Sequence, residues 1–128
     1  MARSDQRIAT ALQALVTLDE LADQPASSIV RDAAIQRFAY TFEATWKAAQ
    51  AVLLDRFGIE LASPKPVVRA SLENGLLTEE DARIGLAMVD HRNLTAHTYN
   101  EELANAIFAQ IPSYRKLLRE WLERLAKA

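Results

Sequence analysis

The side chains best suited to chemistry lie close together in one short segment, which reads D-H-R-N-L-T-A-H-T-Y-N from Asp90 to Asn100. The imidazole of His97 could take up or release a proton near neutral pH. The guanidinium of Arg92 could bind a phosphate group and stabilise negative charge that develops on it. These two residues are the candidate catalytic groups, and the neighbours that could support them are Asp90, His91, Asn93 and Thr95.

Arg92 also has a purely structural interpretation. It follows Met88 and Val89 by four and three residues, so on a helix it extends an apolar face. A charge on such a face is expected to reach out to solvent or to pair with a carboxylate, for which Asp90 and Glu43 are the candidates. Glu43 itself interrupts an apolar run, so it could hold Arg92, touch a substrate, or be a boundary carboxylate paired with a neighbour.

The spacing of His97 from Arg92 matters for any shared site. His97 comes five residues later, which on an unbroken helix separates the two side chains by about 140°. They converge only if the helix loosens near Thr95 and Ala96. Thr98 and Asn100, which follow, favour caps and turns over helix interiors, so we expect a break there. The alternative is that His97 caps the end of its helix. His91 is expected to face solvent, although its position would also let it line the same cleft.

The remaining sequence predicts the helices that must position this segment, because its apolar spacing is helical almost throughout. We expect helices from Asp5 to Ala22 and from Ser28 to Phe57, the second stopped by Gly58. A short helix should begin between Ser63 and Pro66 and end at Asn74 and Gly75. The next should open at Thr78, which with Asp81 resembles a capping box, and the last at Asn100.

The expected core faces follow from the same spacing. The first helix should bury one stripe, and the long second helix two adjoining lines. The last helix should keep one face throughout, with a kink or local break near Pro112 rather than two separate helices. These predictions describe an all-α, up-and-down four-helix bundle with one additional short helix, in a single domain over residues 1–128. The residues expected in the core are Ile8, Leu12, Leu15, Leu18 and Ala22; Phe38, Phe42, Thr45, Ala49 and Val52 beside Ala39, Trp46 and Leu53; Val67, Val68 and Leu72; Ile84, Met88 and Val89; and Ile107, Ile111, Tyr114, Leu118, Trp121 and Leu125.

Composition excludes several classes of protein. The formal charge is −2, so no overall basic field would attract nucleic acid, and any RNA contact needs a local basic patch. The chain has no cysteine and two histidines, which argues against disulfides, thiol catalysis and a multi-histidine zinc site. We therefore expect no metal and no cofactor. No signal peptide and no membrane span is expected, and the predicted location is the cytoplasm.

The segment from Arg92 to Tyr99, with its pattern R-x4-H-x-Y, resembles the signature of the HEPN superfamily of nucleotide-binding helical domains. More narrowly, the chain resembles the nucleotidyltransferase substrate-binding proteins, HEPN members that accompany a minimal nucleotidyltransferase. The similarity extends from F-E-A-T-W-K (Phe42 to Lys47) through this segment to I-P-x-Y (Ile111 to Tyr114). It therefore covers most of the chain.

The resemblance implies a homodimer in which two copies of the motif face a shared cleft. In many relatives that cleft is a metal-independent endoribonuclease acting as a toxin, with Arg92 and His97 as the matching catalytic residues here. The resemblance also implies that a nucleotidyltransferase partner attaches adenylyl groups to Tyr99 and so silences the nuclease, which requires an exposed Tyr99. The alternative is a tyrosine packed over the helix junction.

Two other functions remain open. The chain could be a non-catalytic subunit that presents a nucleotide or other substrate to a nucleotidyltransferase, or a helical dimer that only assembles with a partner. It lacks a Gly-Ser followed by paired aspartates, the motif expected of the nucleotidyltransferase itself. The transferase should therefore be a different polypeptide.

Overall fold

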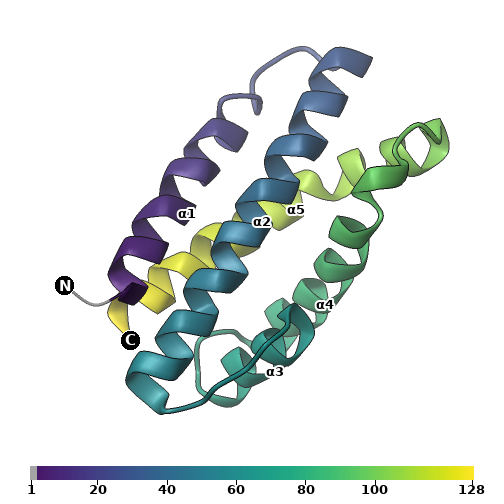
Figure 1. Cartoon of the computed structure of the whole chain (residues 1–128). Helices are drawn as coiled ribbons and strands as arrows, with labels where there is room; N and C mark the ends of the chain where they lie inside the picture. Colours follow the sequence, from purple (N-terminus) through teal and green to yellow (C-terminus); the bar gives the residue numbers. More distant parts are fainter. Residues whose placement is uncertain (1–2) are drawn as a thin grey trace.

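The computed structural model describes residues 3–128, and all the regular elements in this range are helices. Three long helices lie side by side, and two shorter ones pack along them (Figure 1). The predicted all-α bundle of four substantial helices and one short helix is confirmed. In chain order the helices are α1 (Arg3–Asp19), α2 (Ser28–Phe57), α3 (Pro64–Glu73), α4 (Glu79–Asn93) and α5 (Glu101–Lys127), with a 3-10 turn at Thr95–His97 before α5.

The helix ends are set by local capping chemistry. The Ser27 side chain accepts a hydrogen bond from the amide of Val30 at 3.1 Å, which opens α2. Gly58 closes the same helix with φ of 68°, a left-handed conformation that favours glycine. The bounds of α2 are therefore those expected from the sequence.

The structure shows only one of the two hydrogen bonds of the predicted capping box at Thr78. The Thr78 hydroxyl accepts a hydrogen bond from the Asp81 amide at 3.1 Å, as expected. The Asp81 carboxylate instead pairs with Arg124 Nη1 at 3.2 Å. This pair ties the start of α4 to the end of α5.

The expected faces of α1 and α3 were partly wrong. Helix α1 ends at Asp19, three residues before the predicted end, and Ala22 is exposed. Leu12 is 42% exposed, and the small Ala11 is fully buried in its place. Helix α1 packs against both α2 and α5. The helix is therefore rotated so that Ala11, whose small side chain allows the closest approach, faces its neighbours and Leu12 faces outward. Leu72 of α3 is likewise exposed rather than buried.

Helix α5 is continuous through Pro112. The expected local break is therefore absent from α5, and one helix runs from Glu101 to Lys127. Pro112 is exposed, so the carbonyl that its missing N–H leaves free can face water. The predicted core face of α5 is confirmed in full, since its six residues are all buried: Ile107, Ile111, Tyr114, Leu118, Trp121 and Leu125.

Helices α3 and α4 cross at a glycine. A Cβ added to Gly85 would lie 3.1 Å from Val68 Cγ1, so the absence of a side chain permits this close approach. The crossing fixes the position of α4, the helix that ends at the candidate site. Among residues 3–128, no helix is both long and apolar enough to cross a membrane.

Candidate functional site

The segment singled out from the sequence forms the junction between α4 and α5. Helix α4 ends at Asn93, and the chain tightens into the 3-10 turn before α5 begins. The Thr95 hydroxyl donates a hydrogen bond to the Arg92 carbonyl at 2.8 Å, and the Asn100 side chain caps the amide of Leu103 at 3.1 Å. The predicted loosening near Thr95 is therefore confirmed.

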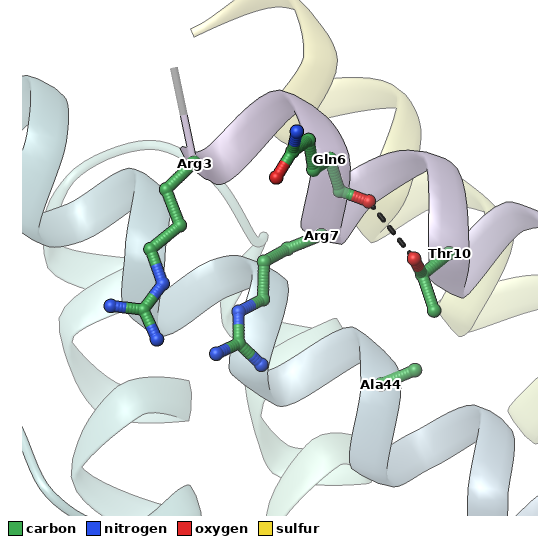
Figure 2. Close-up of a pocket in the computed structure, with 5 residues that line it drawn as sticks. All are labelled: Arg3, Gln6, Arg7, Thr10 and Ala44. Atoms are coloured by element: carbon green, nitrogen blue, oxygen red, sulfur yellow. Dashed lines mark hydrogen bonds between the residues drawn. The ribbon is translucent and has the colours of Figure 1, made fainter. Parts of the chain in front are cut away.

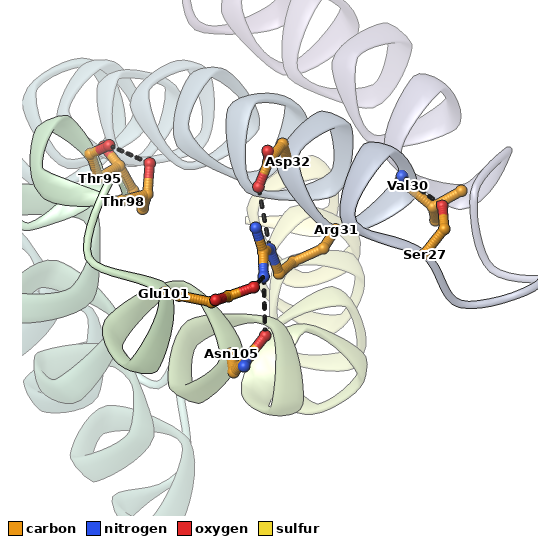
Figure 3. Close-up of polar contacts among 8 residues, drawn as sticks. All are labelled: Ser27, Val30, Arg31, Asp32, Thr95, Thr98, Glu101 and Asn105. Atoms are coloured by element: carbon orange, nitrogen blue, oxygen red, sulfur yellow. Dashed lines mark hydrogen bonds and ion pairs between the residues drawn. The ribbon is translucent and has the colours of Figure 1, made fainter.

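Arg31 on α2 holds the first turn of α5 in place beside this junction, as Figure 3 shows. Its Nε donates to Asp32 at 3.0 Å, and its Nη1 donates to Asn105 at 3.0 Å and to Glu101 at 3.4 Å. The Arg31 side chain is only 12% exposed, and the hydrogen bonds to Asp32 and, to a smaller extent, Glu101 raise its pKa. Arg31 thus fixes where the chain leaves the junction.

Arg92 pairs with Glu43 rather than with Asp90. Its Nη2 lies 2.8 Å from Glu43 Oε2, with about a third of each side chain exposed. Asp90 is directed to Lys65, at 2.8 Å. The ion-pair interpretation of Arg92 is confirmed, but the pair lies at the surface, so both side chains remain accessible to a ligand.

Lys47 completes this cluster and was missed by the sequence analysis. Its Nζ lies 3.8 Å from Glu43 Oε1, so one carboxylate serves two cations on different helices. The spacing of Glu43 and Lys47, four residues apart on one helix, is the signal that could have indicated the contact.

His97 and Tyr99 form a second, separate pair. His97 Nδ1 lies 3.4 Å from the Tyr99 hydroxyl, and the two rings meet edge to face with centroids 5.9 Å apart. Tyr99 is 84% exposed, so the alternative of a packed tyrosine is wrong. His97 is also exposed and lies beyond the last residue of α4. Both side chains are therefore open to solvent at the end of the molecule.

His91 does not face solvent as expected. Its Nδ1 lies 2.7 Å from the Tyr114 hydroxyl, and its ring meets the Tyr114 ring edge to face. Tyr114 is 2% exposed and stacks on Phe38, with centroids 5.2 Å apart. Burial, with a smaller contribution from the charge of Asp90, raises the pKa of Tyr114, so the phenol stays protonated at neutral pH. His91 is thus part of the contact between α4 and α5.

The candidate residues therefore fall into an accessible cluster, an accessible pair and four others. Arg92 lies with Glu43 and Lys47, and His97 lies with Tyr99. Within residues 3–128 no hydrogen bond joins Arg92 to His97 directly. The remaining candidates are Thr95, which stabilises the turn; Asp90 and His91, which hold α4 to its neighbours; and Asn93, which is exposed at the end of α4.

The comparison with protein families matches residues 6–127 to the model described as nucleotidyltransferase substrate binding protein like. The chain belongs to this family. The resemblance to the HEPN superfamily seen in the sequence is thereby confirmed. The match includes both helices of the junction and the helix that carries Glu43.

Individual relatives agree with this membership. The chain is 34% identical over 95 residues to the probable ribonuclease HepT of Haemophilus influenzae, a match that covers 68% of this chain and 64% of the relative. The match thus spans a little less than two thirds of that relative's length.

Two solved structures share the fold. A crystal structure of a Thermus thermophilus protein is 57% identical with a TM-score of 0.87, over 90% of this chain and 98% of that one. A Haemophilus influenzae structure, described as revealing the fold of a substrate binding domain of a nucleotidyltransferase, is 26% identical with a TM-score of 0.68, over 96% of both chains.

Proposed function

We propose that this protein is a metal-independent endoribonuclease that works as a homodimer and is silenced by adenylylation of Tyr99. The observation that carries the proposal is the pair of exposed side chains at the junction, His97 and Tyr99, whose ring nitrogen and hydroxyl lie 3.4 Å apart. A histidine and a tyrosine this open on a turn between two helices are suited to contact a ligand rather than to support a core. The kinship with the probable ribonuclease HepT supports the same function.

The cleavage step follows from the groups at the junction. The 2′-hydroxyl of a ribose gives its proton to the imidazole of one His97, and its oxygen attacks the adjacent phosphorus. The bond from phosphorus to the 5′-oxygen breaks, and that oxygen takes a proton from a second imidazole. The products are a 2′,3′-cyclic phosphate and a free 5′-hydroxyl. Arg92 stabilises the charge that builds on the phosphate oxygens.

The need for two imidazoles is the argument for a dimer. Each chain supplies one His97 at its junction, and a dyad that brings two junctions together provides both a base and an acid. Figure 1 shows the junction projecting at one end of α4, away from α1, where a second copy could approach it. Light scattering on the purified protein should give twice the mass of one chain, and the mass of a single chain would contradict this part of the proposal.

Adenylylation of Tyr99 would act through charge and bulk. The Tyr99 oxygen attacks the α-phosphorus of ATP, pyrophosphate leaves, and the phenolic proton can pass to the neighbouring His97. The product carries a negative phosphodiester where an RNA phosphate would otherwise bind, so it repels substrate. The enzyme that performs the transfer is proposed to be a minimal nucleotidyltransferase encoded as a separate chain.

A second candidate function is a non-catalytic subunit that presents a nucleotide to a nucleotidyltransferase. The observation that favours it is the ion pair of Arg92 with Glu43, which neutralises the charge that cleavage would require. The description of the Haemophilus influenzae structure as a substrate binding domain also fits this function. Nuclease and binding subunit use the same surface, so only an activity measurement separates them.

The deciding experiment is cleavage of a mixed RNA pool in EDTA by the wild type, Arg92→Ala and His97→Ala. Arg69→Ala is the matched control, because Arg69 is an exposed arginine of α3 on a different surface. We expect cleavage by the wild type and the control and none by the other two. Absence of cleavage by folded, unmodified dimer would instead favour the binding subunit.

Modification of Tyr99 is tested with the nucleotidyltransferase partner and ATP. Intact-mass measurement should show one or more added adenylyl groups on the wild type and on Tyr40→Phe, and none on Tyr99→Phe. Tyr40 is the matched control because it is 41% exposed, against 84% for Tyr99. Loss of modification in Tyr40→Phe but not in Tyr99→Phe would contradict the assignment.

A further inference from the structure

A basic groove lies between α1 and α2 and reaches Lys47, the lysine that contacts Glu43. One cavity of about 300 Å³ is lined by four residues of α1 and by Ala44 of α2 (Figure 2). A second, of about 280 Å³, shares two of those residues and continues along α2 to the segment after it. The two shared residues are Arg3 and Arg7, and the second cavity adds Lys47. Three cations therefore line one continuous groove.

The two arginine side chains of the groove have no ion-pair partner in the part of the chain that the structure describes. Neither forms an ion pair with any carboxylate of residues 3–128, whereas Arg31, Arg56, Arg115 and Arg124 each do. Figure 2 shows both guanidinium groups reaching from α1 toward α2, about one helical turn apart. Glu60 is the one acidic residue among those that line the two cavities. The groove thus keeps a net positive charge.

The position of Arg3 strengthens this charge. It is the first residue of α1, where the helix dipole is already positive and a cation is unfavourable for the helix. The net charge of the chain is −2, so this local surface contrasts with the rest of the molecule. It is the kind of local basic patch that RNA contact by an acidic protein would need.

The groove is connected to the proposed catalytic residues by shared contacts. Lys47 lies in the groove and contacts Glu43 at 3.8 Å, and Glu43 contacts Arg92 at 2.8 Å. One carboxylate therefore links the cations of the groove to the cation of the site. An anionic chain bound at Arg92 could continue past Lys47 to Arg7 and Arg3, with Glu43, already paired with two cations, as the acidic residue that it passes.

We propose that Arg3, Arg7 and Lys47 bind the phosphate backbone of single-stranded RNA next to the nucleotides held at Arg92 and His97. This inference rests on the proposed ribonuclease function and extends its site. Arginine binds phosphate through two parallel N–H donors, and contacts to the backbone alone carry no sequence information. Ala51, Leu54 and Leu61 line the same groove and offer aliphatic surface against which a ribose or base could pack.

The test is the salt dependence of RNA binding, measured by fluorescence anisotropy in a His97→Ala background. The probe is a labelled single strand of about 12 nucleotides, within the usual site sizes. Each phosphate contact contributes about 0.7 to the slope of log affinity against log salt for single strands. We expect Arg3→Gln with Arg7→Gln to reduce the slope by about 1.4, and added Lys47→Gln by about 0.7 more.

This slope change corresponds to a measurable change in affinity. For the double variant, Arg3→Gln with Arg7→Gln, the ratio of parent to variant affinity should shrink about sevenfold between about 50 and 200 mM salt. The matched control is Arg69→Gln with Lys116→Gln, which removes the same charge from exposed positions on α3 and α5. A groove variant whose slope equals that of the control or of the parent would overturn the proposal, as would a parent that does not bind the strand.

The binding assay and the cleavage assay fail independently. Because binding is read in a protein that lacks His97, a groove effect without wild-type cleavage would retain the RNA-binding groove and reject the nuclease. Wild-type cleavage without a groove effect would retain the nuclease and reject the groove. Circular dichroism of each variant checks that the substitutions leave the helices intact.

Discussion

The contact between His91 and Tyr114 joins the two helices that flank the junction. Its removal should lower stability without affecting cleavage, which would distinguish the structural role of His91 from the catalytic role proposed for His97. Tyr114→Phe deletes only the hydroxyl that lies 2.7 Å from His91 Nδ1. The ring keeps its place in the core, since it stacks on Phe38 and is 2% exposed. The measured change therefore reports the hydrogen bond and not a cavity.

The magnitude follows from the type of bond. A net contribution of about 0.5–1.5 kcal/mol is expected for a hydrogen bond of this kind. Unfolding entropy of about 2.1 cal/mol/K per residue gives about 4 °C in Tm per kcal/mol for a chain of this length, so Tm should fall by about 2–6 °C. Tyr40→Phe is the matched control, because it deletes a hydroxyl whose partner Thr17 is near the surface, and it should cost less than about 0.5 kcal/mol.

The assay is a double-mutant cycle of His91→Ala and Tyr114→Phe, measured by urea unfolding. The coupling energy should equal the net contribution of the hydrogen bond to stability, about 0.5–1.5 kcal/mol, because the two side chains are in contact. His91→Ala should also retain RNA cleavage per folded molecule, whereas His97→Ala should not. A coupling energy near zero, or loss of cleavage in folded His91→Ala, would refute the structural role assigned to His91.

Three further outcomes are expected. Asp19→Asn should destabilise the protein by about 1 kcal/mol. Burial alone would raise the pKa of Asp19, but the hydrogen bonds from Arg119 and Arg115 outweigh burial, so the pKa of Asp19 in the folded protein is lowered. The difference from wild type should therefore be complete above about pH 4 and shrink as the pH falls through the lower folded pKa, as urea unfolding at several pH values can show. Gly58→Ala should cost about 1 kcal/mol in urea unfolding, because no atom lies within 4 Å of the new Cβ and only the left-handed backbone resists it. Arg31→Met should speed amide hydrogen exchange in the first turn of α5 and leave exchange in α1 unchanged. Equal protection of that turn in the wild type and in Arg31→Met would contradict the role of Arg31 at the junction.

The sequence by itself determined the helices and where most of them end. Ser27, Gly58, Thr78 and Asn100 act within one turn of their own chain, so their effect does not depend on what the helices pack against. The break after Asn93 follows from the same kind of local hydrogen bond, made by Thr95. The family signature from Arg92 to Tyr99 is also local, and it correctly indicated the family of the chain.

The tertiary structure decided which side of each helix faces a neighbour. Ala11 is buried in place of Leu12 because α1 lies close to two helices at once, which no single stripe reveals. The same reason explains why His91 contacts Tyr114, two residues that are 23 positions apart in the chain. The packing of the helices also decides that Arg92 pairs with Glu43, since Glu43 lies on a different helix.

The basic groove depends on the same kind of information. Arg3 and Arg7 lie far from Lys47 in the sequence, and only the packing of α1 on α2 brings the three into one groove. Local hydrogen bonds are fixed by neighbours in the chain, so the sequence determines them. Contacts across helices depend on crossing angles and rotations that the packing of many side chains sets together, so only the folded molecule determines which charges meet.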